Sequence, residues 1–215
     1  EREIERIIND SISMKAFLHI SLDEAAPDHS TLTKFKNRIL DFDQRYEQNL
    51  LKEFFDEMIL LAQERGVDLG FTQSIDSTHT IANVNNSKEK ERTQKISDGG
   101  QGKKPRDPDA RYGVKKTKKV KTVKGDKVEI TEGYVGYKSH FSVSADTNLI
   151  TSYLVTTMAA YDGHYFEPLM KDDLKKGVAK REKTTYGADR GYDDGENHVW
   201  LEAKKLKDAI CLKGF

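Results

Sequence analysis

Apolar residues recur at helical spacing through the first third of the chain, beginning with Ile4 and Ile8. This spacing predicts three helices, over residues 2–18, 30–41 and 44–64. Ser30 suits the N-cap of the second helix, because its hydroxyl can accept a hydrogen bond from a free backbone N–H. Gly66 suits the end of the third helix, because glycine readily adopts a positive φ. We therefore predict an all-helical N-terminal region over residues 1–66.

Alternation of apolar and polar side chains replaces the helical spacing after Gly70. Phe141, Val143 and Ala145 alternate with polar residues and predict a half-buried strand, which a turn at Asp146 joins to the next strand as a hairpin. The chain is therefore expected to be an α+β or α/β protein, with a mixed sheet flanked by helices after the helical region. The expected elements are a strand ending at 76, strands over 128–131, 134–145 and 149–157, a helix over 164–178, a strand over 184–188, a helix over 194–206 and a strand over 208–212.

A polar tract interrupts this second region. Residues 83–127 contain almost no large apolar side chain and include Gly-Gly-Gln-Gly at 99–102. Burial of so little apolar surface cannot offset the conformational entropy lost on ordering. We therefore predict a long basic flexible insertion, a loop that is largely disordered without a partner, inside a second domain over residues 67–215.

Charge is distributed unevenly, although the formal net charge of the 215 residues is zero. Residues 1–69 carry 15 acidic and 9 basic side chains, whereas residues 103–127 carry 11 basic and 3 acidic ones. The basic segment therefore suits an anionic partner such as DNA, whose phosphates lysines neutralise. The alternative is that these lysines only form a solvated loop. The lysines assigned to DNA contact are Lys115, Lys116, Lys118, Lys119, Lys121 and Lys124.

The single cysteine, Cys211, excludes an internal disulfide and a cysteine-cluster zinc site. It lies in an apolar run and is predicted to be a small core residue of a reduced, cytoplasmic protein. No apolar stretch approaches the roughly 18 residues that a membrane-spanning helix requires, and no signal peptide is visible. No membrane association is therefore expected.

Two aspartates are the strongest candidates for chemistry. Asp76 stands in Ser-Ile-Asp-Ser-Thr, and Asp189 stands in Tyr-Gly-Ala-Asp-Arg-Gly-Tyr-Asp. Each ends a short strand-like run, where a carboxylate points into a cleft and can hold a divalent metal ion. Two such carboxylates on neighbouring strands are the minimum for metal-assisted phosphoryl transfer. The alternative is that both aspartates only cap turns, as aspartate often does after strands.

Further motifs accompany the two aspartates: Pro27-Asp-His-Ser-Thr-Leu-Thr-Lys-Phe35, Asp107-Pro-Asp-Ala-Arg111, Gly136-Tyr-Lys-Ser-His140 and Val155-Thr-Thr-Met-Ala-Ala-Tyr-Asp162. With these motifs the chain resembles the bacterial and archaeal insertion-sequence transposases of the DDE class, over nearly its whole length. The resemblance implies an RNase H-like fold in which three acidic residues bind two Mg²⁺ or Mn²⁺ ions. Asp76 matches the first acid and Asp189 the second, as catalytic metal ligands. The third, a glutamate in a Tyr…Arg…Glu…Lys pattern on a later helix, has no match, so a truncated and catalytically inactive fragment is expected.

The same resemblance implies DNA transposition by metal-dependent strand cleavage and strand transfer. Its partners would be the DNA of the element ends and of the target, and the acting form a homo-oligomer. Two alternatives stay open: a non-catalytic or inhibitory DNA-binding protein, and a metal-dependent nuclease of the same fold. Arg190, beside the second acid, is assigned to a DNA phosphate. The alternative for Arg190 is an ion pair with a nearby carboxylate that orients the loop.

Other side chains have weaker claims on the site. His79 and His140 could be ligands or DNA contacts, although a lone histidine is more often a hydrogen-bonded structural residue. Glu196 and Glu202 could supply the third acid, although glutamates on helices are usually solvated. The helix over 30–41 could be the recognition element of a helix-turn-helix. The negative charge of its region opposes that role and leaves packing or oligomerisation as the alternative.

Overall fold

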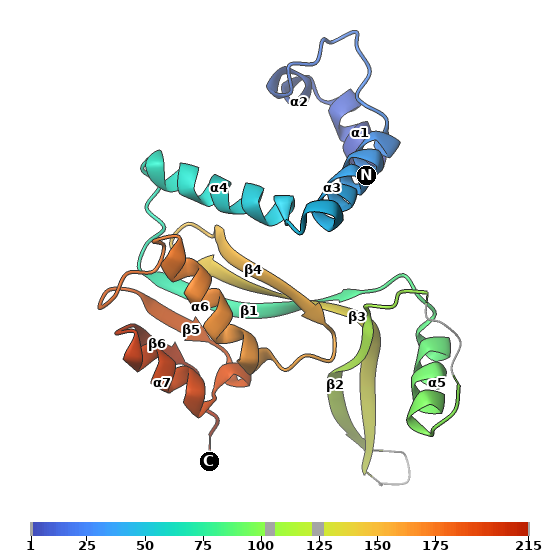
Figure 1. The fold of residues 1–215 in the computed structure, drawn as a ribbon, viewed down its shortest axis with the longest axis vertical. Coiled ribbons are helices and arrows are strands. Elements are labelled where there is room, and N and C mark those ends of the chain that lie inside the picture. The colour runs from blue at the N-terminus through green and yellow to red at the C-terminus, as the bar shows by residue number, and fades with distance from the viewer. Residues whose placement is uncertain (1, 102–105, 122–126, 215) are drawn as a thin grey trace. The chain divides into compact units, whose positions relative to one another are not determined.

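The computed structural model describes residues 2–101, 106–121 and 127–214 and divides into two compact units (Figure 1). The N-terminal unit comprises residues 1–58 and the C-terminal unit residues 59–215. The boundary falls inside helix α4 (Leu50–Glu64), a few residues before the boundary expected at residue 66.

The N-terminal unit is helical, as the apolar spacing predicts, but its first helix is broken. The single helix expected over 2–18 is wrong, because α1 (Arg2–Asp10) and α2 (Ile12–Phe17) are separate. Ser11 adopts extended backbone angles between them, and its hydroxyl accepts a hydrogen bond from the backbone N–H of Met14 at 3.3 Å. A serine inside an apolar helical pattern thus ends one helix and caps the next.

Helix α3 (His29–Tyr46) begins and ends at residues other than those expected. Its N-cap is Asp28 rather than Ser30, since Oδ1 of Asp28 accepts a hydrogen bond from the N–H of Ser30 at 2.8 Å. The helix continues to Tyr46, where Glu47 in the left-handed region, with φ of 52°, ends it. Helix α4 follows, and Gly66 with φ of 84° comes after its last turn, as predicted.

One six-stranded mixed sheet forms the C-terminal unit. Strand β1 (Thr72–Ile81) lies antiparallel to β3 (Lys127–Ser144), and β4 (Ile150–Thr157) lies antiparallel to the other edge of β3. On its other side β1 pairs in parallel with β5 (Thr185–Ala188), and β5 pairs in parallel with β6 (Lys207–Ile210). The order β4-β3-β1-β5-β6, a meander followed by two parallel crossovers, is the RNase H-like order, so the predicted fold class is confirmed.

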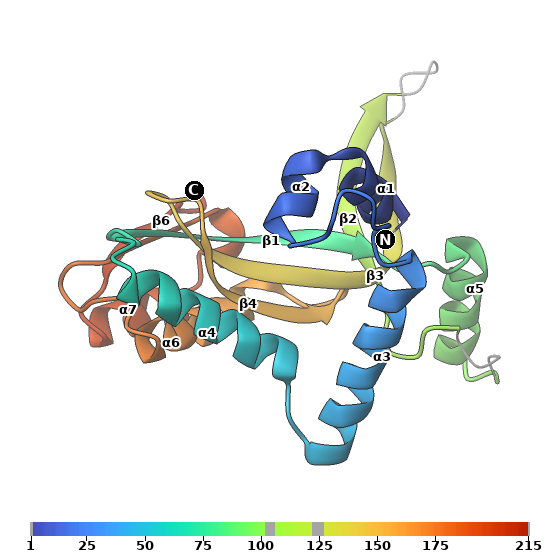
Figure 2. The same cartoon turned by 90° about the horizontal axis from the view of Figure 1, so that it is seen from above.

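Helices α6 (Phe166–Lys175) and α7 (Gly195–Ala203) cover one face of this sheet (Figure 2). The buried core joins Phe166 and Leu169 of α6, and Leu201 of α7, to Ile75 and Tyr186 of the strands. In the first part of β1, Gln73 and Ile75 are buried on the core side, while the even-numbered side chains are exposed on the opposite face. The sheet therefore has a core face and an open face.

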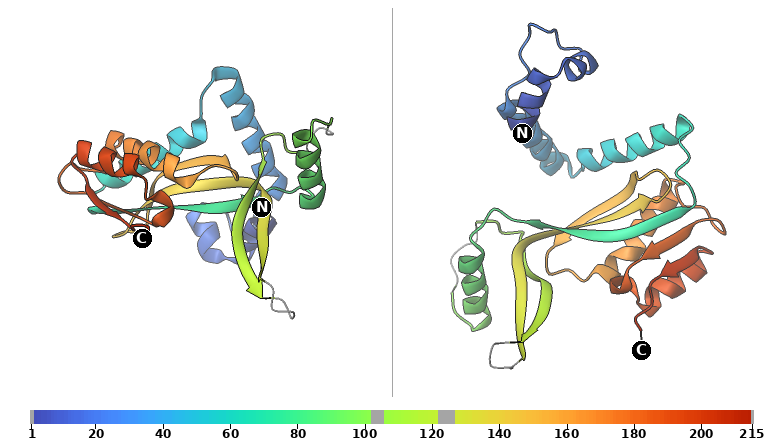
Figure 3. Two further views of the ribbon diagram at one scale, coloured as in Figure 1. Left: turned by 90° about the horizontal axis from the view of Figure 1, so that it is seen from below. Right: turned by 180° about the vertical axis from the view of Figure 1, so that it is seen from behind.

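The insertion over 83–127 is not the loop that its composition predicts. It contains helix α5 (Asn86–Ser97) and strand β2 (Arg111–Lys121), and β2 pairs with the first half of β3 in a hairpin that extends away from the sheet (Figure 3). Backbone pairing with β3 satisfies the N–H and C=O groups of β2 whatever its side chains are, and lysine is well tolerated on an edge strand. Residues 102–105 and 122–126 lie outside the described residues.

Asparagines tie the start of α5 to the sheet. Oδ1 of Asn85 accepts a hydrogen bond from the N–H of Lys88 at 3.0 Å, and so begins the helix. Oδ1 of Asn86 accepts from the N–H of Val135 in β3 at 2.9 Å. The sequence shows the two asparagines, but their hydrogen bonds can be recognised only once the helix is known. Composition alone therefore predicts a loop.

The remaining elements follow the prediction closely. The strands expected over 128–131 and 134–145 form one continuous strand, β3, and the predicted hairpin with β4 is confirmed. A 3₁₀ turn, η1 (Asp162–Tyr165), precedes α6, and a second, η2 (Arg190–Tyr192), follows β5. Cys211 is exposed, so its assignment to the core is wrong. No helix in the described part of the chain is both long enough and apolar enough to cross a lipid bilayer.

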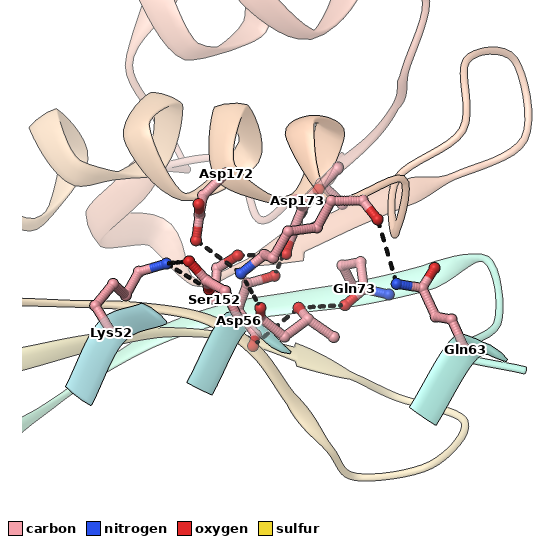
Figure 4. A network of polar contacts seen from close by, with 11 residues as sticks. Lys52, Asp56, Gln63, Gln73, Ser152, Asp172 and Asp173 are labelled. Carbon is pink, nitrogen blue, oxygen red and sulfur yellow. Dashed lines mark hydrogen bonds and ion pairs between the residues drawn. The ribbon is translucent and has the colours of Figure 1, made fainter. Parts of the chain in front are cut away.

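A buried polar network fastens α6 to three strands (Figure 4). The side-chain oxygens of Asp173, with no exposed surface, accept hydrogen bonds from the hydroxyls of Ser142 at 2.6 Å, Ser152 at 2.6 Å and Tyr186 at 2.9 Å. Burial raises the pKa of Asp173, and the hydroxyl donors oppose this only in part. Burial also raises the pKa of Tyr186, which therefore stays a neutral donor.

Candidate active site

The sheet brings the two predicted aspartates side by side. Ile75 of β1 pairs with Ala188 of β5, so Asp76 and Asp189 are the next residues of two adjacent parallel segments. Both are exposed, and Asp76 lies on the open face. The expectation that both end a strand is right only for Asp189, because Asp76 lies inside β1, which continues to Ile81.

Each carboxylate is held by one local hydrogen bond. Oδ1 of Asp76 accepts from the N–H of Ser77 at 2.7 Å. Oδ1 of Asp189 accepts from the N–H of Gly191 at 2.8 Å and so caps η2. Within residues 2–101, 106–121 and 127–214, Oδ2 of each aspartate has no hydrogen-bond partner. Two adjacent carboxylates with free oxygens suit a hard divalent cation, which binds anionic oxygen.

Tyr192 is buried close enough to the two aspartates to feel their charges, with 1% of its surface exposed. Burial raises its pKa, and the negative charges of Asp162, Asp76 and Asp189 raise it further, while the Ser77 hydroxyl lowers it. The phenol therefore stays neutral and packs against Phe166, with ring centroids 5.9 Å apart. Because this phenol is neutral, it adds no charge repulsion to the carboxylates of Asp76 and Asp189.

Asp162 ends the motif at residues 155–162 but is not among the candidate site residues that the sequence suggests. It follows β4, and its Oδ1 lies 2.9 Å from Nζ of Lys138 and 3.7 Å from Nδ1 of His140. His140 is fully buried, and its Nε2 is hydrogen bonded to Oγ1 of Thr156 at 2.9 Å. Burial lowers the pKa of His140 although Asp162 opposes this. His140 is thus a neutral structural residue. Residues 138 and 140 lie on the same face of one strand, and this spacing was the sequence signal that could have predicted that both lie near a common partner.

Asn197 holds the turn that carries the second aspartate. Its side-chain amide donates to the backbone oxygen of Gly163 in η1 at 3.0 Å and to that of Tyr192 in η2 at 3.1 Å. Asn197 itself is 5% exposed. These two turns contact each other and are thereby joined by one buried side chain from α7.

His198 secures the next stretch of chain. Its Nε2 lies 2.9 Å from Oδ1 of Asp193, and its Nδ1 contacts Oδ2 of Asp208 in β6. The carboxylates of Asp208 and Asp193 raise the pKa of His198. The segment after Asp189 is therefore connected to both α7 and β6.

The predicted DNA-contacting residues divide into two places. Arg190 is exposed beside Asp189, at the start of η2. Lys115, Lys116, Lys118, Lys119 and Lys121 lie on β2, whereas Lys124 lies outside the described residues. Asp76 pairs with position 141 of β3 and Lys116 with position 132, which is about 30 Å of strand length. The lysines of β2 are therefore separate from the paired aspartates.

No third acid joins the two aspartates among the residues that the structure describes. Glu196 and Glu202 belong to α7, which packs on the core face through Leu201, whereas Asp76 is exposed on the open face. In the described chain, one group of three His, Cys, Asp or Glu side chains has ligand atoms within 4.8 Å of one another, namely Glu5, Asp28 and His29. Nδ1 of His29 lies 2.9 Å from Oε2 of Glu5, so this group connects α1 to the start of α3.

An RNase H-like sheet with one aspartate on β1 and a second directly after the adjacent parallel strand β5 is the arrangement expected of the catalytic domain of a DDE-class transposase. Comparison with known families places the chain more closely. The model of the Transposase DDE domain matches residues 100–214, just over half of the chain, and that of the Transposase domain (DUF772) matches residues 1–38. The chain belongs to the family of transposases with a DDE domain. The matched ranges include Asp189 but not Asp76.

Other comparisons add little. No curated protein matches the chain. Among solved structures it is similar to a chain of the Mos1 mariner paired end complex with Mn, at 14% sequence identity and a TM-score of 0.32. That similarity covers 91% of this chain and 52% of the other, so the chain spans about half the length of that protein.

Proposed function

We propose that the chain belongs to a transposase polypeptide that performs metal-dependent strand cleavage and strand transfer on DNA, with Asp76 and Asp189 as two of its metal-binding carboxylates. The observation that carries this proposal is the pairing of Ile75 with Ala188, which brings together two aspartates far apart in sequence. Membership of the DDE transposase family supports it.

The residues present fit a divalent cation. Asp76 and Asp189 would hold Mg²⁺ or Mn²⁺ through the oxygens that their local hydrogen bonds leave free. The bound ions would supply the Lewis acid that activates a water and stabilises the leaving oxygen of a phosphodiester. The backbone N–H groups of Ser77 and Gly191 orient the carboxylates, and the exposed guanidinium of Arg190 would bind a phosphate beside them.

DNA joining is the experiment that tests the function. Labelled duplex DNA and Mn²⁺ are incubated with this chain and, in parallel, with the product of its whole gene. A third carboxylate completes the site in the resembling family, and none stands beside the pair in the described residues. We therefore expect the chain alone to bind Mn²⁺ without cutting, and the gene product to join DNA strands.

The possible products of this assay separate the three functions. Joined strands that disappear in Asp76→Asn and Asp189→Asn support the transposase. Cutting without joining favours a metal-dependent nuclease of the same fold, and DNA binding with neither product favours a non-catalytic binding protein. Joining that survives both substitutions would show that the two aspartates are not the metal ligands.

The lysines of β2 are proposed to bind DNA phosphates. Reversal of Lys116, Lys118, Lys119 and Lys121 to glutamate is expected to weaken DNA binding and to flatten its dependence on salt. The expected change is roughly 0.9 of a log-slope unit for each phosphate of duplex DNA that a lysine no longer neutralises. Fluorescence anisotropy between about 50 and 200 mM salt measures both quantities.

The matched control reverses four exposed lysines of the C-terminal unit that lie away from β2: Lys175, Lys183, Lys205 and Lys207. This control changes the net charge by the same amount as the β2 variant. Its loss of DNA affinity therefore measures how much of the effect comes from net charge alone. An equal loss of salt slope in both variants would assign the β2 lysines to a general solvated surface.

A homo-oligomer is the proposed acting form. Joining two element ends to one target requires that two catalytic sites be held together, and the acidic helical unit is a separate compact body that could hold them.

A further inference from the structure

Helix α3 carries an apolar stripe that the rest of the N-terminal unit leaves exposed. Its members recur at alternate spacings of three and four residues, the a and d positions of a heptad repeat. They are Leu32 at 37% exposure, Phe35 at 56%, the half-buried Ile39, Phe42 at 39% and Tyr46 at 55%. None of the 18 residues of α3 is buried. The stripe is therefore a continuous apolar surface along the helix.

The N-terminal unit contains no core that could cover this stripe. Among its described residues, 2–58, only Lys15 and Ala26 are buried. Most of the stability of a helix in a protein comes from the packing of its apolar face. A large exposed apolar surface on such a unit marks a site of protein association.

The charges around the stripe argue against DNA as the partner. Residues 1–58 carry 13 acidic and 8 basic side chains, so the unit repels phosphate overall. The flanking positions instead suit a second helix of the same sequence. In the heptad, Arg38 occupies a g position and Asp43 the e position of the next heptad, and such pairs meet across two parallel helices.

We propose that the α3 stripe of one copy pairs in parallel with the α3 stripe of a second copy, so that the N-terminal unit is a dimerisation unit whose core forms between chains. The pairing buries the a and d side chains of both helices and places Arg38 of each copy near Asp43 of the other. This inference deepens the homo-oligomer part of the proposed function. It does not depend on the DNA chemistry.

Sedimentation of the 215-residue chain tests the pairing. We expect the chain to sediment as a dimer of 24.5 kDa subunits. Phe35→Lys should raise the dimer dissociation constant by about 100-fold, because each copy loses one buried aromatic side chain and must place an ammonium in the seam. Leu40→Lys is the matched control: Leu40 is 52% exposed but lies outside the stripe, so the constant should change less than about twofold.

A disulfide trap gives a second measurement that does not rely on loss of affinity. Cys211 is replaced by serine, and a cysteine is then introduced either at the stripe, as Ile39→Cys, or beside it, as Leu40→Cys. Mild oxidation should link the Ile39→Cys chains into covalent dimers at least about tenfold faster than the Leu40→Cys chains, because a positions face each other across a parallel pair.

Three outcomes would overturn the proposal. They are a monomeric wild-type chain, a dimer that Phe35→Lys leaves intact, and equal trapping at 39 and 40. Every one of these measurements reports mass or cross-linking without DNA or metal. A failure of the dimer proposal therefore leaves the test of strand joining unaffected. A dimer that fails to join DNA would equally leave this proposal intact.

Discussion

Replacement of either Asp76 or Asp189 by asparagine is expected to lower the affinity of the chain for Mn²⁺ by at least about tenfold and to abolish metal-dependent DNA joining by the gene product. Asparagine keeps the shape of the side chain and loses its charge, and a hard cation binds anionic oxygen far better than an amide. Loss of a residue that only orients a ligand typically costs about 10–100-fold, so loss of a ligand should cost at least as much. Titration followed by Mn²⁺ electron paramagnetic resonance measures the affinity.

Two controls keep this result specific. Asp109→Asn changes an exposed aspartate far from the pair in the chain and should leave Mn²⁺ affinity unchanged. Glu196→Gln tests the alternative third acid and should also have no effect, because α7 lies on the core face. If Glu196→Gln lowers the affinity as strongly as Asp76→Asn, the metal site is on the other side of the sheet and the assignment is wrong.

The sequence predicts the central feature of the site because that feature follows from strand order. Ile75 and Ala188 are apolar neighbours of the two aspartates, and both enter the core. A strand that buries the residue before its aspartate must expose the aspartate itself. Once the chain is placed in an RNase H-like order, the two acidic positions become adjacent.

Other parts of the site could not be derived in this way. Asn197 donates hydrogen bonds to the backbone oxygens of Gly163 and Tyr192. Any residue could supply a backbone oxygen, so no sequence motif predicts these bonds. The hairpin of β2 and β3 also escapes prediction. Its stability comes from backbone pairing at a sheet edge, whereas composition reports only side chains. The apolar stripe of α3 was visible as helical spacing, but only its exposure shows that the described residues of its own unit do not cover it.

Replacement of the buried Asp173 has the largest expected effect on stability. Asp173→Ala should reduce the free energy of unfolding by about 3–5 kcal/mol, because it leaves the hydroxyls of Ser142, Ser152 and Tyr186 buried without their acceptor. Urea unfolding followed by circular dichroism measures the change. Glu167→Ala on the same helix is the matched control. It removes an exposed ion pair with Lys171, and should cost less than about 1 kcal/mol.

Asp173 is also expected to make the stability of the fold depend on pH. Because burial raises the pKa of Asp173 above its ordinary value of 3.8, the folded protein keeps this proton at pH values where the unfolded chain has lost it. The stability that this proton contributes is therefore complete below the ordinary pKa and is lost as the pH rises through the folded-state value. Asp173→Asn carries an uncharged amide at every pH, so the stability of the wild type should fall relative to the variant as the pH rises from about 4 toward neutrality. A difference between the two proteins that stays constant over this range would show that Asp173 is ionised in the fold, and the hydroxyl donors would then outweigh burial.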